Sequence, residues 1–457
     1  MVLLAGRWSS HCDRGGAFGM SRWVMTLLVV APAGPVAAQH KVARAPEVWL
    51  CAGDGVTELL REDAEWPLVK QNLSGVKLYI DQIDRASPER LAALVKLVQE
   101  QHCQVAVECG CCLDFGPMDD TNGEWSARLE LGKIDKWYAA GGKVGYLDLD
   151  GPIRRLMFPD GRRDGRRFDS MEKAANEVVD AVRVFHEAHP EIRFWHLTNF
   201  PNWGYLGDVS YHARGPQRKD YGEYDDAHRL VYEKLKAAGI LLSGVTIDNP
   251  YDYLIGEHFP VNLADPKTVD WLGRVRAYED RCRGEGLEVN LIVNSERGGQ
   301  ESDERFCRET LQMVETYLHA GGRPTRWFVQ TWYPHPKQIV PESAPNTMTG
   351  LVKAVIERVR ANSEAPGTGR ANGGLIEGVV SGLGGSLLTH RAILRVPPAE
   401  EWRNWPRIGA SLPGEGELLT ELPEFVLGTA ERVGPGGLIL SGRSTMTGMC
   451  APLQPPV

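Results

Sequence analysis

The chain has 457 residues, a formal net charge of -9 at pH 7 and 42% hydrophobic residues, a composition typical of a globular protein. An acidic chain without a basic motif lacks the positive field that holds a phosphate backbone, so we expect no nucleic-acid partner. No apolar run reaches the roughly 20 residues that a membrane-spanning helix needs, so we expect no membrane partner either.

The first 38 residues have the pattern of a secretory signal peptide. Arg22 provides a basic start, Val24 to Val30 an apolar core, and Val36-Ala37-Ala38 the small residues that a signal peptidase needs. A translation start at Met20 would leave this pattern unchanged. A disordered amino-terminal extension is the alternative. We expect a secreted protein, either extracellular or periplasmic, and the sequence indicates no oligomeric state.

Between Glu47 and Glu364 the sequence repeats one pattern eight times: a short run rich in β-branched residues, followed by a longer stretch of helical periodicity. The expected strands are Val48 to Gly53, Val76 to Ile83, Gln104 to Gly110, Lys143 to Asp150, Arg193 to Asn199, Gly244 to Asn249, Glu288 to Glu296 and Arg326 to Trp332. Several intervening helices end in glycine, as at Gly141, Gly239 and Gly321. This alternation predicts a parallel sheet closed into a (β/α)8 TIM barrel, with any active site at the carboxyl ends of the strands.

Cysteines concentrate around the third expected strand, at Cys103 and in Cys109-Gly110-Cys111-Cys112. Export would make disulfides accessible to them. Zinc is the alternative, but no second paired cluster and no neighbouring His-x-x-x-His supplies the usual ligand spacing. We therefore expect a disulfide or buried thiols here.

After Glu364 the periodic pattern stops. Residues 365–374 are rich in Gly, Asn and Thr, and we interpret them as a linker. Leu375 to Val457 is rich in Gly and Pro with short apolar runs, which is compatible with a small β-type appendage or with disorder. The sequence assigns no role to this carboxyl-terminal extension.

Side chains alternate between the two faces of a strand, and in several expected strands one face is apolar and the other ionisable. The polar residues expected to face into the barrel are Lys77, Tyr79, Asp81, Glu108, Tyr146, Asp148, Asp150, His196, Thr198, Thr246, Asp248, Asn290, Asn294, Glu296, Gln330 and Trp332. Buried carboxylates are unfavourable unless paired or hydrated, so folding alone does not explain this concentration. We expect a site at the mouth; an ion-pair network around Lys77 that plugs the barrel is the alternative.

Aromatic residues follow the same strands. Trp125, Trp203, Tyr205, Tyr251, Tyr253, Trp332 and Tyr333 lie in the expected loops after the strands. Sugar rings stack their apolar faces on such side chains, although packing explains any single one. Carboxylates beside aromatic platforms are the combination that breaks a glycosidic bond, because one acid protonates the leaving oxygen while a second attacks or activates water.

The barrel resembles the large clan of retaining (β/α)8 glycoside hydrolases, which carry a catalytic Glu at the end of strand seven and usually a Trp at the end of strand eight. Asn294-Ser295-Glu296 and Gln330-Thr331-Trp332 stand at these places. The clan's acid/base Glu on strand four is replaced by Tyr146-Leu147-Asp148-Leu149-Asp150-Gly151-Pro152. The Asp-x-Asp there is similar to chitinase-type barrels, whose following Glu is replaced by Gly151-Pro152.

We therefore predict a secreted glycosidase that degrades a polysaccharide or oligosaccharide, with Glu296 as nucleophile or base and Asp150 as proton donor. Crowding by neighbouring carboxylates would raise the pKa of such a donor. The expected substrate-binding residues are Asp81, Glu108, Asp148, His196, Asn199, Trp203, Asp248, Asn294, Gln330, Trp332 and Tyr333. Glu108, Asp148 and Asp248 could exchange roles with the catalytic pair. His196 is alternatively a core histidine. No cofactor is expected.

Two other functions fit the same barrel. Asp148 or Asp150, together with His196, Asp248 and Glu296, could hold a divalent metal as in sugar isomerase-like barrels. A non-catalytic sugar-binding barrel is the third hypothesis. Loss of activity on exhaustive chelation distinguishes the isomerase-like reaction from hydrolysis, and binding without turnover indicates the third.

Six arginines follow the fourth expected strand: Arg154, Arg155, Arg162, Arg163, Arg166 and Arg167. Guanidinium groups bind carboxylates and sulfates in a bidentate way, so this loop could hold an acidic polysaccharide at the rim. A solvated charge run paired with neighbouring acids is the alternative.

Overall fold

A computed structural model describes residues 46–159, 164–207, 209–211, 221–258 and 265–364, together with five strands between residues 375 and 444. The expected signal peptide, the expected linker at 365–374, and Arg162 and Arg163 lie outside the described residues. Among the described residues, no helix is both long and apolar enough to cross a membrane.

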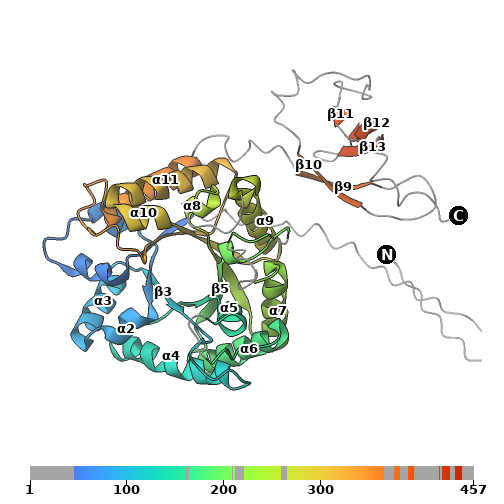
Figure 1. Cartoon of the computed structure of the whole chain (residues 1–457). Helices are drawn as coiled ribbons and strands as arrows, with labels where there is room; N and C mark the ends of the chain where they lie inside the picture. Colours follow the sequence, from blue (N-terminus) through green and yellow to red (C-terminus); the bar gives the residue numbers. More distant parts are fainter. Residues whose placement is uncertain are drawn as a thin grey trace, which may run out of the picture. The chain divides into compact units, whose positions relative to one another are not determined.

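Eight parallel strands form a closed barrel in the order β1 to β8, and helices surround it (Figure 1). The strands are β1 (Glu47–Cys51), β2 (Gly75–Tyr79), β3 (Gln104–Cys109), β4 (Tyr146–Asp150), β5 (Arg193–Asn199), β6 (Leu242–Asp248), β7 (Glu288–Val293) and β8 (Arg326–Gln330). Strand β8 pairs with β1 from Glu47↔Arg326 to Cys51↔Gln330, which closes the sheet. The (β/α)8 prediction is confirmed.

The helices are α1 (Pro67–Asn72), α2 (Ile80–Arg85), α3 (Pro88–Glu100), α4 (Asn122–Ala139), α5 (Pro152–Met157), α6 (Met171–Ala188), α7 (Tyr224–Ala237), α8 (Tyr251–Leu254), α9 (Trp271–Gly284), α10 (Glu296–Glu301), α11 (Asp303–His319) and α12 (Met348–Glu364). Three short 3-10 helices are η1 (Gly53–Leu60), η2 (Phe200–Asn202) and η3 (Pro266–Thr268).

Local sequence explains where these helices begin and end. Ser170 caps α6 by accepting a hydrogen bond from the backbone of Lys173, and Asp270 caps α9 in the same way. Gly141 and Gly321, which follow α4 and α11, have φ of +88° and +78°. These are left-handed conformations that glycine adopts without the steric cost that a Cβ would bring.

Six strands, β1, β2, β3, β6, β7 and β8, end earlier than the sequence indicated, and the difference is largest for β2 and β7. Strand β2 stops at Tyr79, and the next residues form α2. Strand β7 stops at Val293, so Glu296 is the first residue of α10 rather than the last residue of a strand. After β2 the helix α2 begins at Ile80, where the apolar alternation still continued, whereas after β7 the polar residues Asn294 and Ser295 lead into α10.

The amino-terminal half of the barrel interior is filled by an inner aromatic cluster: Trp49, Ala106, Tyr146, Trp195, Leu197, Ile292 and Phe328. The rings of Tyr146 and Trp195 stack with centroids 3.8 Å apart. Below this cluster the buried guanidinium of Arg326 bonds to Glu47 at 3.0 Å and to Glu288 at 2.8 Å. The barrel interior is therefore filled at this end, which leaves the carboxyl ends of the strands as the place for a ligand within the barrel.

Two antiparallel sheets occur in the carboxyl-terminal extension. Strand β9 (Leu375–Val380) pairs with β10 (His390–Arg395), and β12 (Phe425–Arg432) pairs with both β11 (Glu421–Leu422) and β13 (Leu438–Ser444).

Candidate active site

A cavity of about 390 Å³ opens at the carboxyl-terminal mouth of the barrel. It is lined by Asn199, Pro201, Asn202, Asp248, Pro250, Tyr253, Glu296, Gln300, Trp332 and Tyr333. These residues lie at or just after the carboxyl ends of β5, β6 and β8, and in α10, which follows β7. Parallel strands bring these ends together at one rim, which is the reason that residues far apart in the sequence meet there.

Glu296 is held at this cavity from both its backbone and its side chain. Its backbone N–H donates to Asp252 Oδ1 at 3.0 Å, and the hydroxyl of Tyr253 donates to its Oε2 at 2.8 Å. Ser295 caps α10 by accepting from the backbone N–H of Gly298 at 2.9 Å. The carboxylate is therefore fixed toward the cavity rather than free to rotate.

Tyr253, His258 and Asp252 form a chain of hydrogen bonds next to Glu296. His258 Nδ1 donates to Asp252 Oδ2 at 2.6 Å, and His258 Nε2 lies 2.9 Å from the hydroxyl oxygen of Tyr253. Tyr253 was expected only as an aromatic platform, and neither Asp252 nor His258 was expected at the site. Their position in the segment that follows the sixth expected strand, at the mouth of the barrel, was the available indication.

Asp248 ends β6 and is the second carboxyl group that lines the cavity. Burial raises the pKa of Asp248 well above its ordinary value, and the nearby carboxylates of Glu108 and Asp150 raise it further. This shift favours the protonated form of Asp248, the form in which a carboxyl group can donate a proton.

Asp150 is in the opposite electrostatic environment. The guanidinium of Arg155 donates to the carboxylate and, at 2.9 Å, to the backbone oxygen of Asp150, while Asn199 Nδ2 donates to Oδ1 at 3.3 Å. Burial alone would raise the pKa of Asp150, but Arg155 and Arg154 outweigh burial and lower it. The expectation that crowding raises the pKa of Asp150 is therefore wrong, because α5 brings arginine against it.

Deeper in the barrel, Lys77 bridges two acids. Its Nζ lies 2.6 Å from both Glu108 Oε2 and Asp148 Oδ2, and Gln330 Nε2 donates to Glu108 at 3.0 Å. Burial raises the pKa of both carboxyl groups, and Lys77 opposes that rise. This arrangement corresponds to the ion-pair network that sequence analysis named as an alternative, but it lies beneath the cavity rather than in place of it.

Several buried polar atoms around the mouth accept or donate no hydrogen bond within the part of the chain that the structure describes. They are Asn199 Oδ1, Asp248 Oδ1, Asn294 Oδ1 and Nδ2, Gln330 Oε1 and Tyr333 OH. Leaving such groups unsatisfied costs about 1–3 kcal/mol each. Water or a ligand with hydrogen-bonding groups would satisfy them, whereas an apolar ligand would not.

The aromatic residues divide into platforms and packing residues. Trp332 is 44% exposed at the cavity, with its ring centroid 4.8 Å from that of Tyr333. Trp203 is 3% exposed and packs against Tyr221 and Tyr224. Trp332 is thus available for stacking on a ligand, whereas Trp203, also expected to bind substrate, is covered by other aromatic rings.

Three other expected mouth residues lie elsewhere. His196 and Thr198 face outward: the hydroxyl of Tyr224 in α7 is 3.3 Å from His196 Nδ1, while Trp195 and Leu197 fill the interior. Burial lowers the pKa of His196 to about 3, so it is the neutral core histidine of the alternative. Asp81 is on α2, exposed and paired with Lys133 at 2.9 Å. The expectation failed on β5 because its apolar residues, Trp195 and Leu197, face the interior and its polar residues face the helices.

The mouth does not assemble the expected metal ligands. Among the described residues, three or more potential His, Cys, Asp or Glu ligand atoms lie close together only at His228, Cys282 and Glu285, on the helices outside the barrel. The seven described cysteines are all free thiols, and Cys109, Cys111 and Cys112 are buried. Of the two expectations for that cluster, buried thiols are confirmed.

Comparison with known proteins assigns no family. No family model matches the chain, and no curated protein sequence matches it.

Solved structures match weakly. A GH10 endoxylanase from a sugarcane soil metagenome is 10% identical, with 64% of this chain and 89% of that chain covered and a TM-score of 0.37. The 3-keto-D-glucoside 4-epimerase of E. coli is 9% identical, with 68% and 98% covered and a TM-score of 0.36. A 3-deoxy-D-arabino-heptulosonate 7-phosphate synthase from Thermotoga maritima is 12% identical, with 70% and 88% covered and a TM-score of 0.37. Barrels with such different reactions assign no activity to this one.

Proposed function

We propose that this protein is a glycoside hydrolase in which Asp248 donates the proton and Glu296 acts as nucleophile or base. The observation that carries the proposal is the combination of two carboxyl groups and an exposed tryptophan, Trp332, in one open cavity. The buried polar atoms around the mouth support a polyhydroxy substrate. Asp150, the proton donor expected from the sequence, is replaced in this role because Arg155 holds it as a carboxylate.

The proposed reaction uses each group according to its environment. Asp248 transfers its proton to the glycosidic oxygen as the bond from that oxygen to the anomeric carbon breaks. The Glu296 carboxylate attacks the anomeric carbon, or removes a proton from a water molecule that attacks it. Tyr253 keeps Glu296 directed at the cavity by its hydrogen bond of 2.8 Å. Stacking on Trp332 would orient the sugar ring.

The proposal concerns neutral glycans. The charged side chains that line the cavity are Asp248 and Glu296, both acidic, and they would disfavour a uronate in the reacting position. In the arginine loop, Arg166 pairs with Asp164 at 2.9 Å, as a solvated charge run would. We also propose export of the protein on the pattern of its first 38 residues, which amino-terminal sequencing of the secreted form tests.

The test is turnover of a panel of neutral oligosaccharides and aryl glycosides by the purified chain, with Glu296→Gln and Asp248→Asn variants. We expect Glu296→Gln to lower kcat by at least about 100-fold. Asp248→Asn should impair natural glycosides far more than activated aryl glycosides, because activated leaving groups need no proton. Asp81→Asn is the matched control: it makes the same change on an exposed carboxylate away from the cavity, and it should leave kcat unchanged.

Three outcomes would contradict the proposal. Activity of Glu296→Gln within tenfold of the wild type would remove Glu296 from the reaction. Loss of activity on chelation, restored by a divalent ion, would favour the isomerase-like reaction. Binding of glycans, measured by calorimetry, without turnover of any of them would favour a non-catalytic sugar-binding barrel.

A further inference from the structure

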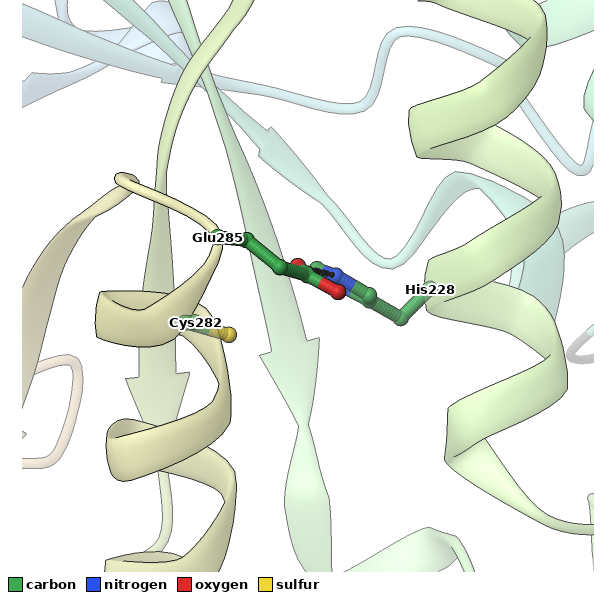
Figure 2. A group of neighbouring side chains, drawn as sticks. All are labelled: His228, Cys282 and Glu285. Carbon is green, nitrogen blue, oxygen red and sulfur yellow. Dashed lines mark hydrogen bonds and ion pairs between the residues drawn. The ribbon is translucent and has the colours of Figure 1, made fainter. Parts of the chain in front are cut away.

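A second cluster of chemically reactive side chains lies outside the barrel mouth, between α7 and α9 (Figure 2). His228 extends from α7, Cys282 lies in the last turn of α9, and Glu285 follows that helix directly. The Nε2 atom of His228 is 2.8 Å from Glu285 Oε2. The potential ligand atoms of all three residues lie within 4.8 Å of one another.

We propose that His228, Cys282 and Glu285 bind one divalent transition-metal ion, and that zinc is the ion that fits them best. One nitrogen, one sulfur and one oxygen donor form a set typical of zinc. Calcium and magnesium prefer oxygen ligands alone, so the thiol disfavours them. A thiolate and a carboxylate together neutralise the two positive charges of the ion.

The geometry requires only small movements. Zinc bonds of about 2.0–2.3 Å place tetrahedral ligand atoms roughly 3.3–3.8 Å apart, so the present separations need to change by about 1 Å. The hydroxyl of Tyr278 bonds to His228 Nδ1 at 2.9 Å, which directs Nε2 toward Glu285. Arg281 Nε donates to the other oxygen of Glu285 at 3.2 Å. Such supporting hydrogen bonds orient the ligands of natural metal sites.

An ion could reach these three residues from solvent, and once bound it would connect two helices. His228 and Cys282 are fully buried, whereas the side chain of Glu285 is 26% exposed, so an ion can enter from solvent and keep a water molecule as its fourth ligand. A bound ion would link α7 to α9, two helices that pack against β6. The proposal is independent of the chemistry at the mouth, because none of its three ligands lines the cavity.

The experiment uses the full chain, stripped with a chelator and titrated with zinc in a calorimeter and with cobalt in a spectrophotometer. We expect one zinc ion per chain, a thiolate-to-cobalt charge-transfer band in the near ultraviolet, and a rise in Tm of about 5 °C at a zinc concentration about 100-fold above Kd. Cys282→Ser should abolish the cobalt band, and Glu285→Gln should weaken zinc binding at least about tenfold.

Cys307→Ser is the matched control, because Cys307 is another buried free thiol, on α11. It should bind zinc and cobalt as the wild type does, and so should Glu296→Gln. Absence of stoichiometric zinc binding, or a cobalt band that persists in Cys282→Ser, would overturn the proposal. The hydrogen bonds of His228 to Tyr278 and Glu285 would then be a purely structural arrangement. If Cys282→Ser does not fold, unchanged zinc affinity in Glu285→Gln, which alters the exposed ligand, overturns it equally.

Discussion

Among single residues, Lys77 contributes most clearly to the charge balance of the barrel. It is fully buried, and its Nζ lies 2.6 Å from the carboxylates of both Glu108 and Asp148. A carboxylate without a counter-charge in such a place is strongly unfavourable. The lysine is therefore what permits acids to accumulate beneath the cavity.

We predict that Lys77→Met lowers the free energy of unfolding by about 3–5 kcal/mol at pH 7, since it leaves buried Asp148 uncompensated. The loss should be smaller at acidic pH, because burial raises the pKa of Asp148 and protonation removes the charge. Urea denaturation at pH 5 and pH 7 measures both effects. Lys133→Met is the control: its partner Asp81 is exposed, so it should cost less than about 1 kcal/mol. Equal losses in the two variants would contradict this account of Lys77.

The sequence predicted which residues lie at the mouth of the barrel, whereas their roles stay predictions. Glu296, Asp248 and Trp332 line the cavity as expected. The alternation of side chains along a strand does not predict that Arg155 of α5 contacts Asp150, because that contact depends on the path of the chain after β4. It also misassigned His196, because on β5 the apolar residues Trp195 and Leu197 face the barrel interior.

Among the elements, the turn after β3 is fixed by one carboxyl group of α4. Glu130 accepts hydrogen bonds from the backbone N–H groups of Gly110 at 2.8 Å and Cys111 at 2.9 Å. Cys111 has a φ of +60°, which is unfavourable for a residue with a side chain. The two hydrogen bonds hold this conformation. Burial is the main cause that raises the pKa of Glu130, to about 7.

This raised pKa predicts how stability changes with pH. The folded state holds the proton of Glu130 more tightly than the unfolded state does, so the contribution of Glu130 is complete below about pH 4.5 and is lost as pH rises through 7. Glutamine does not titrate. The free energy of unfolding of the wild type, minus that of Glu130→Gln, should therefore fall by about 3 kcal/mol between pH 4 and pH 8. A pH-independent difference in urea denaturation would show that Glu130 titrates normally.

The kind and order of the elements followed from the sequence, whereas some ends did not. Periodicity and the glycines after helices identified all eight strand and helix units. The end of β2 was missed because α2 begins with Ile80 and Asp81, which continue the strand pattern, and the end of β7 was missed because Glu296 was expected on the same face as Asn290 and Asn294. Helix α10 begins where Ser295 provides a cap, and its six residues are too few for periodicity to detect.

In the whole molecule, the barrel is complete without the carboxyl-terminal extension. Strands β1 to β8 close between Glu47 and Gln330, and the buried side chains of α12 pack into the main hydrophobic core. They include Met348, Leu351, Val352 and Val355. The strands between residues 375 and 444 pair only with each other.

We predict that a chain ending at Glu364 unfolds in one cooperative transition and keeps its free energy of unfolding within about 1 kcal/mol. A chain ending at Asn346 lacks α12 and exposes its apolar contact surface, so it should be destabilised by several times that amount. Thermal and urea denaturation compare the two. A broad or lost transition in the chain ending at Glu364 would mean that the barrel depends on the residues after it.

The inner aromatic cluster brings chromophores from distant parts of the chain into one asymmetric array. The indole rings of Trp49 and Trp195 lie 5.9 Å apart at 71°, and Tyr146 stacks on Trp195. These rings belong to β1, β4 and β5, and Phe328 of β8 packs edge-on against Trp49 at 5.4 Å. Rings coupled at such distances give circular dichroism in the near ultraviolet only while their mutual orientation is fixed. The near-ultraviolet circular dichroism of the protein should therefore report whether β1 and β8 stay paired, without any added label.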